Sequence, residues 1–153
     1  MGLVCLRRAE RIPGRMKFFS TLKAERCLTQ LLSERDPAGS EARKALDGLR
    51  SIGAVAIPPV IDAFATADRE HGNALVTLLS SLLEDKTFPL YAEGLGHPNK
   101  VCVAGVTKAL ALSGNYDTNR LMELLGKEEI FKPALIELLG IVRKRLNARD
   151  LLR

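Results

Sequence analysis

A leucine recurs along the chain at a nearly constant interval. The steps are 30, 31 and 29 residues, between Leu49, Leu79, Leu110 and Leu139. A second block repeats with the same period, and its copies run from Pro58 to Phe64, from Pro89 to Leu95 and from Asn119 to Leu125. Self-similarity with a period of about 20–50 residues is typical of repeat architectures, in which stacked units share one hydrophobic core. The period therefore constrains the fold more than any single motif does.

The apolar residues within each copy have helical spacing. They fall on one stripe of a helix at Ala42, Ala45, Leu46, Leu49 and Ile52, and no segment alternates as a half-buried strand would. We expect Pro58 and Pro89 in first turns, hydroxyl caps from Thr87 and Thr118, and helix ends at Gly53 and Gly114, where a left-handed residue is tolerated. The sequence therefore predicts an all-α fold.

A single pair of such helices buries too little surface to stand alone, so neighbouring pairs must stack. The segment Leu49-Arg50-Ser51-Ile52-Gly53, followed by Pro58 to Phe64, resembles bacterial HEAT repeats, and the resemblance extends over roughly residues 36–153. It implies an armadillo-type fold, a right-handed α-solenoid of stacked antiparallel helix pairs with a period of about 30 residues. The family includes adaptors, enzyme subunits and a few enzymes, so the resemblance indicates architecture more than function.

The expected domain organisation is one α-solenoid over residues 18–153, beginning with a helix near residues 18–35. Residues 1–17 are basic and lack the repeat pattern. We interpret them as a disordered leader or a misassigned start, with a basic arm for an acidic partner as the alternative. The next copy would begin near Arg149, but the sequence ends at Arg153. This predicts either a truncated array that continues in a longer protein or a frayed tail.

Charge and cysteine content limit the partners and the compartment. Residues 16–142 hold 14 basic and 16 acidic residues, so the repeat body shows no continuous basic stripe of the kind that nucleic acid requires. A basic cluster follows the last apolar stripe, where cations complement a helix dipole or contact phosphate. It comprises Arg143, Lys144, Arg145, Arg149 and Arg153.

The three cysteines, Cys5, Cys27 and Cys102, form no disulfide framework or metal-binding pair, which favours the reducing cytoplasm, and Cys102 is expected in the core. No apolar run is long enough to cross a membrane, so we expect no membrane partner.

Binding residues are expected on the second helix of each pair, because in HEAT-like arrays this helix set commonly lines the concave surface. One slot of that helix varies in charge from copy to copy, as a surface that recognises a ligand would. The candidates are Lys44, Asp47, Thr77, Lys108 and Glu137.

No catalytic motif emerges from the sequence. His71 and His97 are the only histidines, and neighbouring repeats would have to bring them together, with Glu70 or Asp85, to form a metal site. We favour structural roles for both and predict no metal, cofactor or catalytic residue.

The favoured function is a non-catalytic scaffold or adaptor that binds a protein partner. The first alternative is a nucleic-acid-binding protein, perhaps of the base-excision type, although the chain has no Trp for base stacking. The second is an accessory subunit or lyase for a cofactor-bearing protein.

Overall fold

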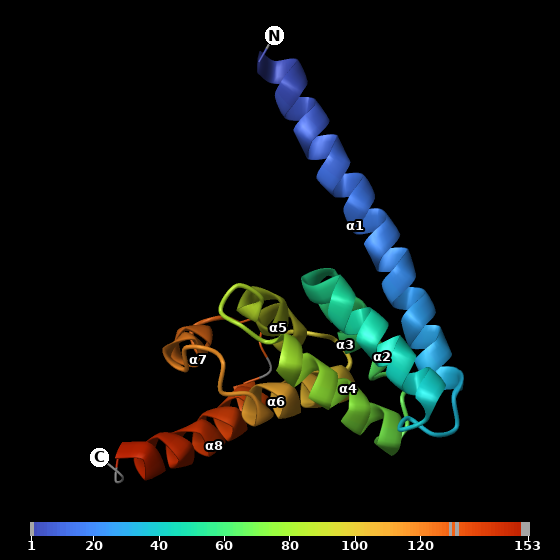
Figure 1. The fold of residues 1–153 in the computed structure, drawn as a ribbon. Coiled ribbons are helices and arrows are strands. Elements are labelled where there is room, and N and C mark those ends of the chain that lie inside the picture. The colour runs from blue at the N-terminus through green and yellow to red at the C-terminus, as the bar shows by residue number, and fades with distance from the viewer. Residues whose placement is uncertain (1, 129, 131, 151–153) are drawn as a thin grey trace. The chain divides into compact units, whose positions relative to one another are not determined.

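Helices are the only regular secondary structure in the part of the chain that the structure describes (Figure 1), which confirms the all-α prediction. The computed structural model describes residues 2–128, 130 and 132–150, and it describes side chains for residues 18–128, 130 and 132–144. The elements are α1 (Gly2–Ser33), α2 (Ser40–Ile52), the 3-10 helix η1 (Gly53–Ala56), α3 (Ile57–Ala63), α4 (Arg69–Leu82), α5 (Phe88–Leu95), α6 (Lys100–Leu112), α7 (Asn119–Leu124) and α8 (Lys132–Asp150). Each repeating apolar segment of the sequence thus forms a helix.

Two compact units make up the chain, Met1–Pro59 and Val60–Arg153. Because the chain divides into two units, the single continuous array predicted over residues 18–153 stays a prediction. The leader predicted at residues 1–17 also stays a prediction. The backbone of residues 2–17 belongs to α1, and side chains are described only from Phe18 onward.

The first unit is built on the packing of α1 against α2. Both helices bury residues at intervals of three and four, namely Ala24, Leu28 and Leu31 on α1 and Ala42, Ala45 and Leu49 on α2. Gly48 lets the two helices approach closely, because a Cβ atom at this position would lie 3.0 Å from the Cys27 sulfur. The stripe predicted from Ala42 to Leu49 is therefore the buried face of α2.

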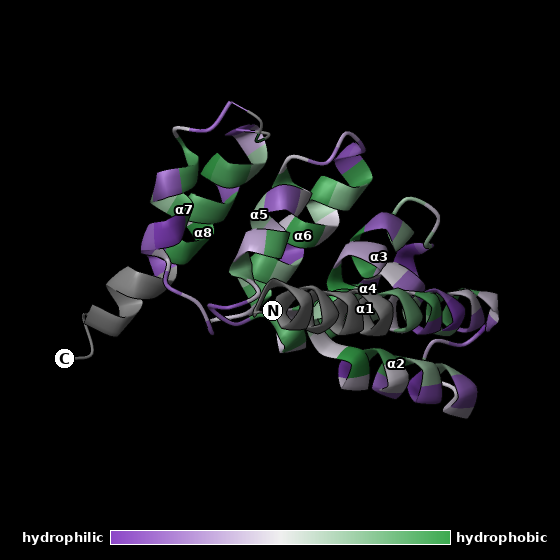
Figure 2. Cartoon of the chain, turned by 90° about the horizontal axis from the view of Figure 1, so that it is seen from above, coloured by the Kyte–Doolittle hydropathy of each residue, from purple (hydrophilic) through white to green (hydrophobic). Residues whose placement is uncertain are grey.

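The second unit is organised around α6, which packs against α4, α5 and α8, while α7 packs against α8. Figure 2 shows α5 beside α6 and α7 beside α8, with hydrophobic surfaces between the members of each pair. Leu79 and Leu110 are fully buried and Leu139 is half-buried. The leucine period thus marks positions that pack inside the molecule.

Two glycines set the distance between neighbouring elements in this unit. A Cβ atom on Gly105 of α6 would lie 2.6 Å from the ring of Phe64, and one on Gly94 of α5 would lie 2.8 Å from the side chain of Val106. Both distances are too short for a real side chain. The missing side chain at Gly105 allows the aromatic ring to lie directly on the helix backbone.

The helix ends match the sequence expectations only in part. Gly53 ends α2 with a positive φ of 77°, as predicted, but Gly114 has no positive φ. Thr87 and Thr118 precede α5 and α7 as expected, yet neither side chain caps the helix, so this prediction was wrong.

The reason is visible at Thr87, whose hydroxyl accepts from the backbone N–H of Glu84 at 3.0 Å and so serves the preceding turn. The side chains that do cap are those of Asp68 and Asn99, which accept from the N–H groups of His71 and Val101.

Candidate functional site

The exposed sides of α4, α6 and α8 form the most distinctive surface of the second unit. These helices are neighbours, since α6 packs against both of the others. On α6 Lys100 is exposed at the start of the helix, and the exposed residues Val101, Ala104, Lys108 and Leu112 follow the i, i+3, i+7 and i+11 spacing of one helical stripe. We call the exposed side of the three helices the α4–α6–α8 surface. Its exposed side chains are Arg69, Asn73, Thr77, Val101, Ala104, Lys108, Leu112, Ile136, Glu137 and Lys144.

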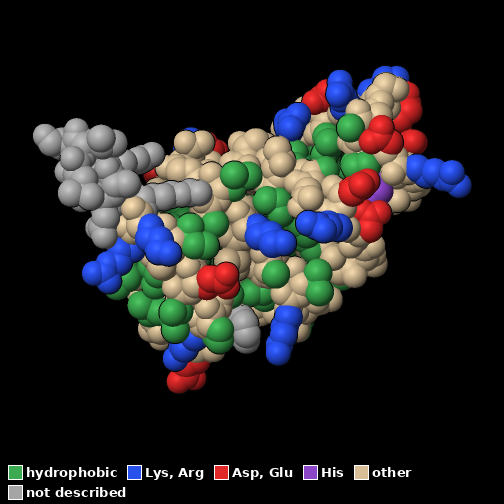
Figure 3. All heavy atoms as spheres, turned by 90° about the horizontal axis from the view of Figure 1, so that it is seen from below, with side chains coloured by type: hydrophobic (Ala, Val, Ile, Leu, Met, Phe, Trp, Pro, Cys, Tyr) green, Lys and Arg blue, Asp and Glu red, His purple; other side chains and the backbone are tan. Residues whose placement is uncertain are grey.

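This surface mixes large apolar side chains with cations. Val101 and Leu112 are each 55% exposed and Ile136 is 61% exposed. Figure 3 shows the molecule from below, where α4, α6 and α8 lie, with hydrophobic and Lys or Arg side chains intermixed and few acidic ones near the centre. Apolar side chains gathered on one exposed surface are typical of an interaction site, whereas single scattered ones are not.

A groove with a volume of about 310 Å³ lies between α4 and α6. Phe64 and Gly105 line it, and no side chain projects from α6 at Gly105. Phe64 itself is only 5% exposed. The groove is lined by Phe64, Ala67, Asp68, Arg69, Gly72, Asn73, Val76, Val101, Ala104, Gly105 and Lys108. We call it the α4–α6 groove.

The charges around the α4–α6 groove are unbalanced. Arg69 and Lys108 are exposed, and among the described residues neither has an ion-pair partner. The one carboxylate of the lining, Asp68, is already engaged, because one of its oxygens lies 2.8 Å from both the backbone nitrogen and Nδ1 of His71. These hydrogen bonds, chiefly the one from the backbone N–H, lower the pKa of Asp68. Asp68 keeps its negative charge, so two cations and one carboxylate give the lining a net charge of +1, and neither cation has an ion pair among the described residues.

The structure places the predicted binding residues in two groups. Thr77, Lys108 and Glu137 lie exposed on α4, α6 and α8, so that all three belong to the α4–α6–α8 surface. Lys108 also lines the α4–α6 groove, while the Thr77 hydroxyl donates to the backbone carbonyl of Asn73 at 3.1 Å. The three residues thus lie exposed on neighbouring helices, and their role in binding stays a prediction.

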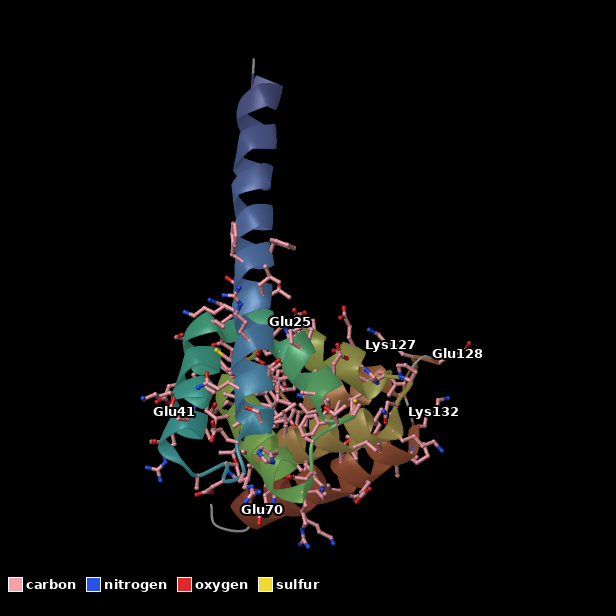
Figure 4. The ribbon with its side chains drawn as sticks, turned by 90° about the vertical axis from the view of Figure 1, so that its right-hand side faces the viewer. Glu25, Glu41, Glu70, Lys127, Glu128 and Lys132 are labelled. Carbon is pink, nitrogen blue, oxygen red and sulfur yellow. The ribbon has the colours of Figure 1, made fainter. Side chains whose placement is uncertain are left out.

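Lys44 and Asp47 lie on α2 in the first unit, where each has a neighbour on its own helix. The Lys44 ammonium donates to Glu41 at 2.9 Å, and this hydrogen bond raises the pKa of Lys44. Asp47 accepts from Arg50 at 3.1 Å. Figure 4 labels Glu41 on this helix. Such exposed pairs contribute little to stability.

The predicted basic cluster is described only at its start. Arg143 and Lys144 are exposed on α8, and Arg143 lines a second groove, of about 450 Å³, with Met122 of α7 and Leu139 of α8. Arg145, Arg149 and Arg153 lie outside the residues whose side chains the structure describes. Figure 4 shows a further cation, Lys132, at the start of α8 near Lys127 and Glu128.

The two histidines serve separate hydrogen bonds. His71 is buried, with 4% exposure, and contacts Asp68, whereas Nε2 of His97 lies 2.9 Å from Asp62. His97 also accepts from the N–H of Asn99 through Nδ1, so the neutral ring with its proton on Nε2 satisfies both contacts. Among the described residues, no group of three or more His, Cys, Asp or Glu side chains is placed to hold a metal ion. Cys102 is fully buried, as predicted, and Cys27 is half-buried.

Sequence reasoning missed Arg69, Asn73 and the Phe64–Gly105 floor of the groove. A signal was present at Gly105, because a glycine inside an otherwise regular helix destabilises it by about 1 kcal/mol relative to alanine and often marks close packing. Arg69 gave no such signal. A cation in the first turn opposes the helix dipole, and no sequence pattern identifies it as a binding residue.

Comparison with known protein families, curated proteins and solved structures gave no match to this chain. The HEAT-like resemblance therefore rests on the residues quoted from the sequence. Within the described part of the chain, no helix combines the length and apolar character that a membrane span requires.

Proposed function

We propose that this chain is a non-catalytic scaffold that binds a protein partner through the α4–α6–α8 surface. The proposed architecture is a HEAT-like, right-handed α-solenoid. Its support is the repeated packing of every second helix, α4 on α6 and α6 on α8, together with the burial of leucines at the repeat period. In the proposed setting the protein works in a reducing bacterial cytoplasm, with which the free thiols of Cys27 and Cys102 are compatible.

The observation that carries the proposal is the exposure of Val101, Leu112 and Ile136 on adjacent helices. Covering these side chains removes apolar area from water, which contributes about 25 cal/mol per Å² before the costs of association. The helices are held in place by a buried core, so the surface loses little conformational freedom when a partner binds. A preformed surface of apolar and charged side chains is better suited to binding a protein partner than to catalysing a reaction.

Nucleic-acid binding is the second candidate, and the cations support it. Arg69, Lys108 and Lys144 all lie on the α4–α6–α8 surface. Against it stand the apolar side chains between them and the burial of both tyrosines, Tyr91 and Tyr116, which leaves no exposed tyrosine for base stacking. No observation among the described residues favours an accessory role for a cofactor-bearing protein.

The proposal is tested by comparative affinity purification with the full chain as bait. Val101→Glu and Ile136→Glu place like-sized polar groups on the surface without entering the core. We expect specific protein partners to be lost from both variants and retained by Met122→Glu, which makes the same kind of change at an exposed apolar side chain of α7. Partners that all three variants retain would place the binding site elsewhere.

A fluorescence anisotropy titration separates the two candidate functions. Labelled duplex and single-stranded DNA are titrated with the full chain across a series of salt concentrations. The scaffold proposal predicts no binding at low salt. Binding that weakens steeply with added salt and is abolished by Lys108→Glu would favour nucleic acid instead.

A further inference from the structure

The α4–α6 groove combines an apolar floor with cations at its edge. Phe64 and Gly105 form part of the floor, and Ala104 and Val76 extend it along α6 and α4. Arg69 lies in the first turn of α4. Of the α6 residues that line the groove, Lys108 is the nearest to the C-terminal end of the helix. A ligand that fits must therefore carry an apolar group and negative charge together.

The size of the groove narrows the ligand further. A volume of about 310 Å³ lies at the lower end of the range for small-molecule pockets, which runs from about 300 to 1,000 Å³. It has room for one large apolar side chain rather than for an extended cofactor. Because the groove opens onto the α4–α6–α8 surface, a side chain that enters it belongs naturally to a segment lying across that surface.

Charge complementarity identifies what flanks that side chain. The two cations have no acidic partner among the described residues, and the only carboxylate of the lining is held by His71. Asn73 of α4 adds an amide to the lining. Carboxylates of a bound segment would gain charge-assisted hydrogen bonds from Arg69 and Lys108.

We propose that the α4–α6 groove binds an acidic segment of a partner protein, with a large apolar side chain over Phe64 and Gly105 and flanking carboxylates on Arg69 and Lys108. The inference rests on the proposed scaffold function and adds the chemistry of the partner. The groove is specific because a ligand must present both a large apolar side chain and negative charge. The rest of the α4–α6–α8 surface supplies contact area.

The test begins with phage display of short random peptides against the immobilised full chain. We expect enriched peptides to carry Leu, Ile, Met, Phe or Trp with Asp or Glu nearby. A labelled copy of the most enriched peptide is then titrated by fluorescence anisotropy. Lys108→Glu and Arg69→Glu should each weaken its binding by about tenfold or more, while the matched reversal Lys86→Glu, at an exposed site outside the groove, leaves it nearly unchanged.

A variant that leaves all charges in place tests the apolar part separately. Ala104 is exposed and lines the groove, so Ala104→Phe fills the space without disturbing the core. It should weaken peptide binding by about tenfold or more, and its thermal melting curve should match that of the natural chain. Binding should also weaken as salt is added, since the contacts with the two exposed cations are screened.

The outcomes distinguish the groove from the scaffold proposal. Enriched peptides that lack acidic residues, or that bind the Lys108→Glu and Ala104→Phe variants normally, would overturn the groove assignment. If the same peptides lost affinity for Ile136→Glu, the α4–α6–α8 surface would still bind proteins by other contacts. Enrichment of no peptide, together with no partner lost in the affinity purification, would count against both proposals.

Discussion

Replacing Gly105 with alanine tests the packing that creates the α4–α6 groove. The three atoms nearest to a Cβ at this position, at 2.6 to 2.7 Å, all belong to the ring of Phe64. A buried aromatic ring cannot bend away as a flexible side chain would, so the ring or the helix must shift. The added methyl group therefore forces a rearrangement of the floor of the groove.

Two opposing contributions set the size of the effect. Alanine is favoured over glycine inside a helix by about 1 kcal/mol. Inserting a methyl group into a packed site without room costs about 1–3 kcal/mol, and occasionally more. At 2.6 Å we expect the upper part of that range, so Gly105→Ala should lower the free energy of unfolding by about 1–2 kcal/mol.

Gly140→Ala is the matched control, because it lies in α8 of the same unit and a Cβ there meets nothing within 4 Å. It should raise the free energy of unfolding by up to about 1 kcal/mol. Urea unfolding of the full chain, followed by far-UV circular dichroism, measures both changes. A double-mutant cycle with Phe64→Leu should recover part of the loss at Gly105, since the smaller side chain makes room. If Gly105→Ala were as stabilising as Gly140→Ala, Phe64 would not lie on α6 and the reasoning would fail.

Three further predictions concern single buried or capping groups. Tyr91→Phe removes a buried hydroxyl that donates to the carbonyl of Leu79, and should lower the free energy of unfolding by about 1 kcal/mol in urea titrations. Burial raises the pKa of the Cys102 thiol, so in a Cys5→Ser protein a thiol reagent should modify Cys27 well before Cys102, and equal rates would contradict the burial of Cys102. The pKa of Asp68 is lowered below its ordinary value of 3.8, so its stabilising effect is complete above that value and is lost as the pH falls through the lowered pKa. Asp68→Asn should therefore flatten the acid end of a melting-temperature profile, whereas an unchanged profile would show that the cap does not titrate as described.

The helical fold was predictable because its information is local and repeated. The buried stripe of α2 follows directly from the spacing of Ala42, Ala45 and Leu49, and the leucine period identified buried positions in successive helices. Helix ends were less predictable. Thr87 has the right residue type in the right place, but its hydroxyl bonds to the preceding turn instead of the following helix. Competition between neighbouring turns for one hydroxyl depends on backbone geometry that the residue type does not encode.

The candidate site was predictable as a set of helices but not as a groove. Thr77, Lys108 and Glu137 share a repeat slot, so periodicity alone placed them on neighbouring helices. The α4–α6 groove depends on contacts between residues far apart in the sequence, above all Phe64 and Gly105. The residue pattern within a single helix does not indicate which aromatic ring packs against which glycine of another helix.

Site-specific photo-crosslinking shows whether the α4–α6–α8 surface contacts a protein partner. A photoreactive phenylalanine analogue is introduced at Leu112, which is 55% exposed on this surface, or at Glu93, on the exposed side of α5, and the full chain is irradiated in cells. The account predicts a discrete crosslinked protein from the Leu112 position, absent from the Glu93 position and lost with Ile136→Glu. Equal products from both positions, or crosslinks to nucleic acid alone, would contradict it.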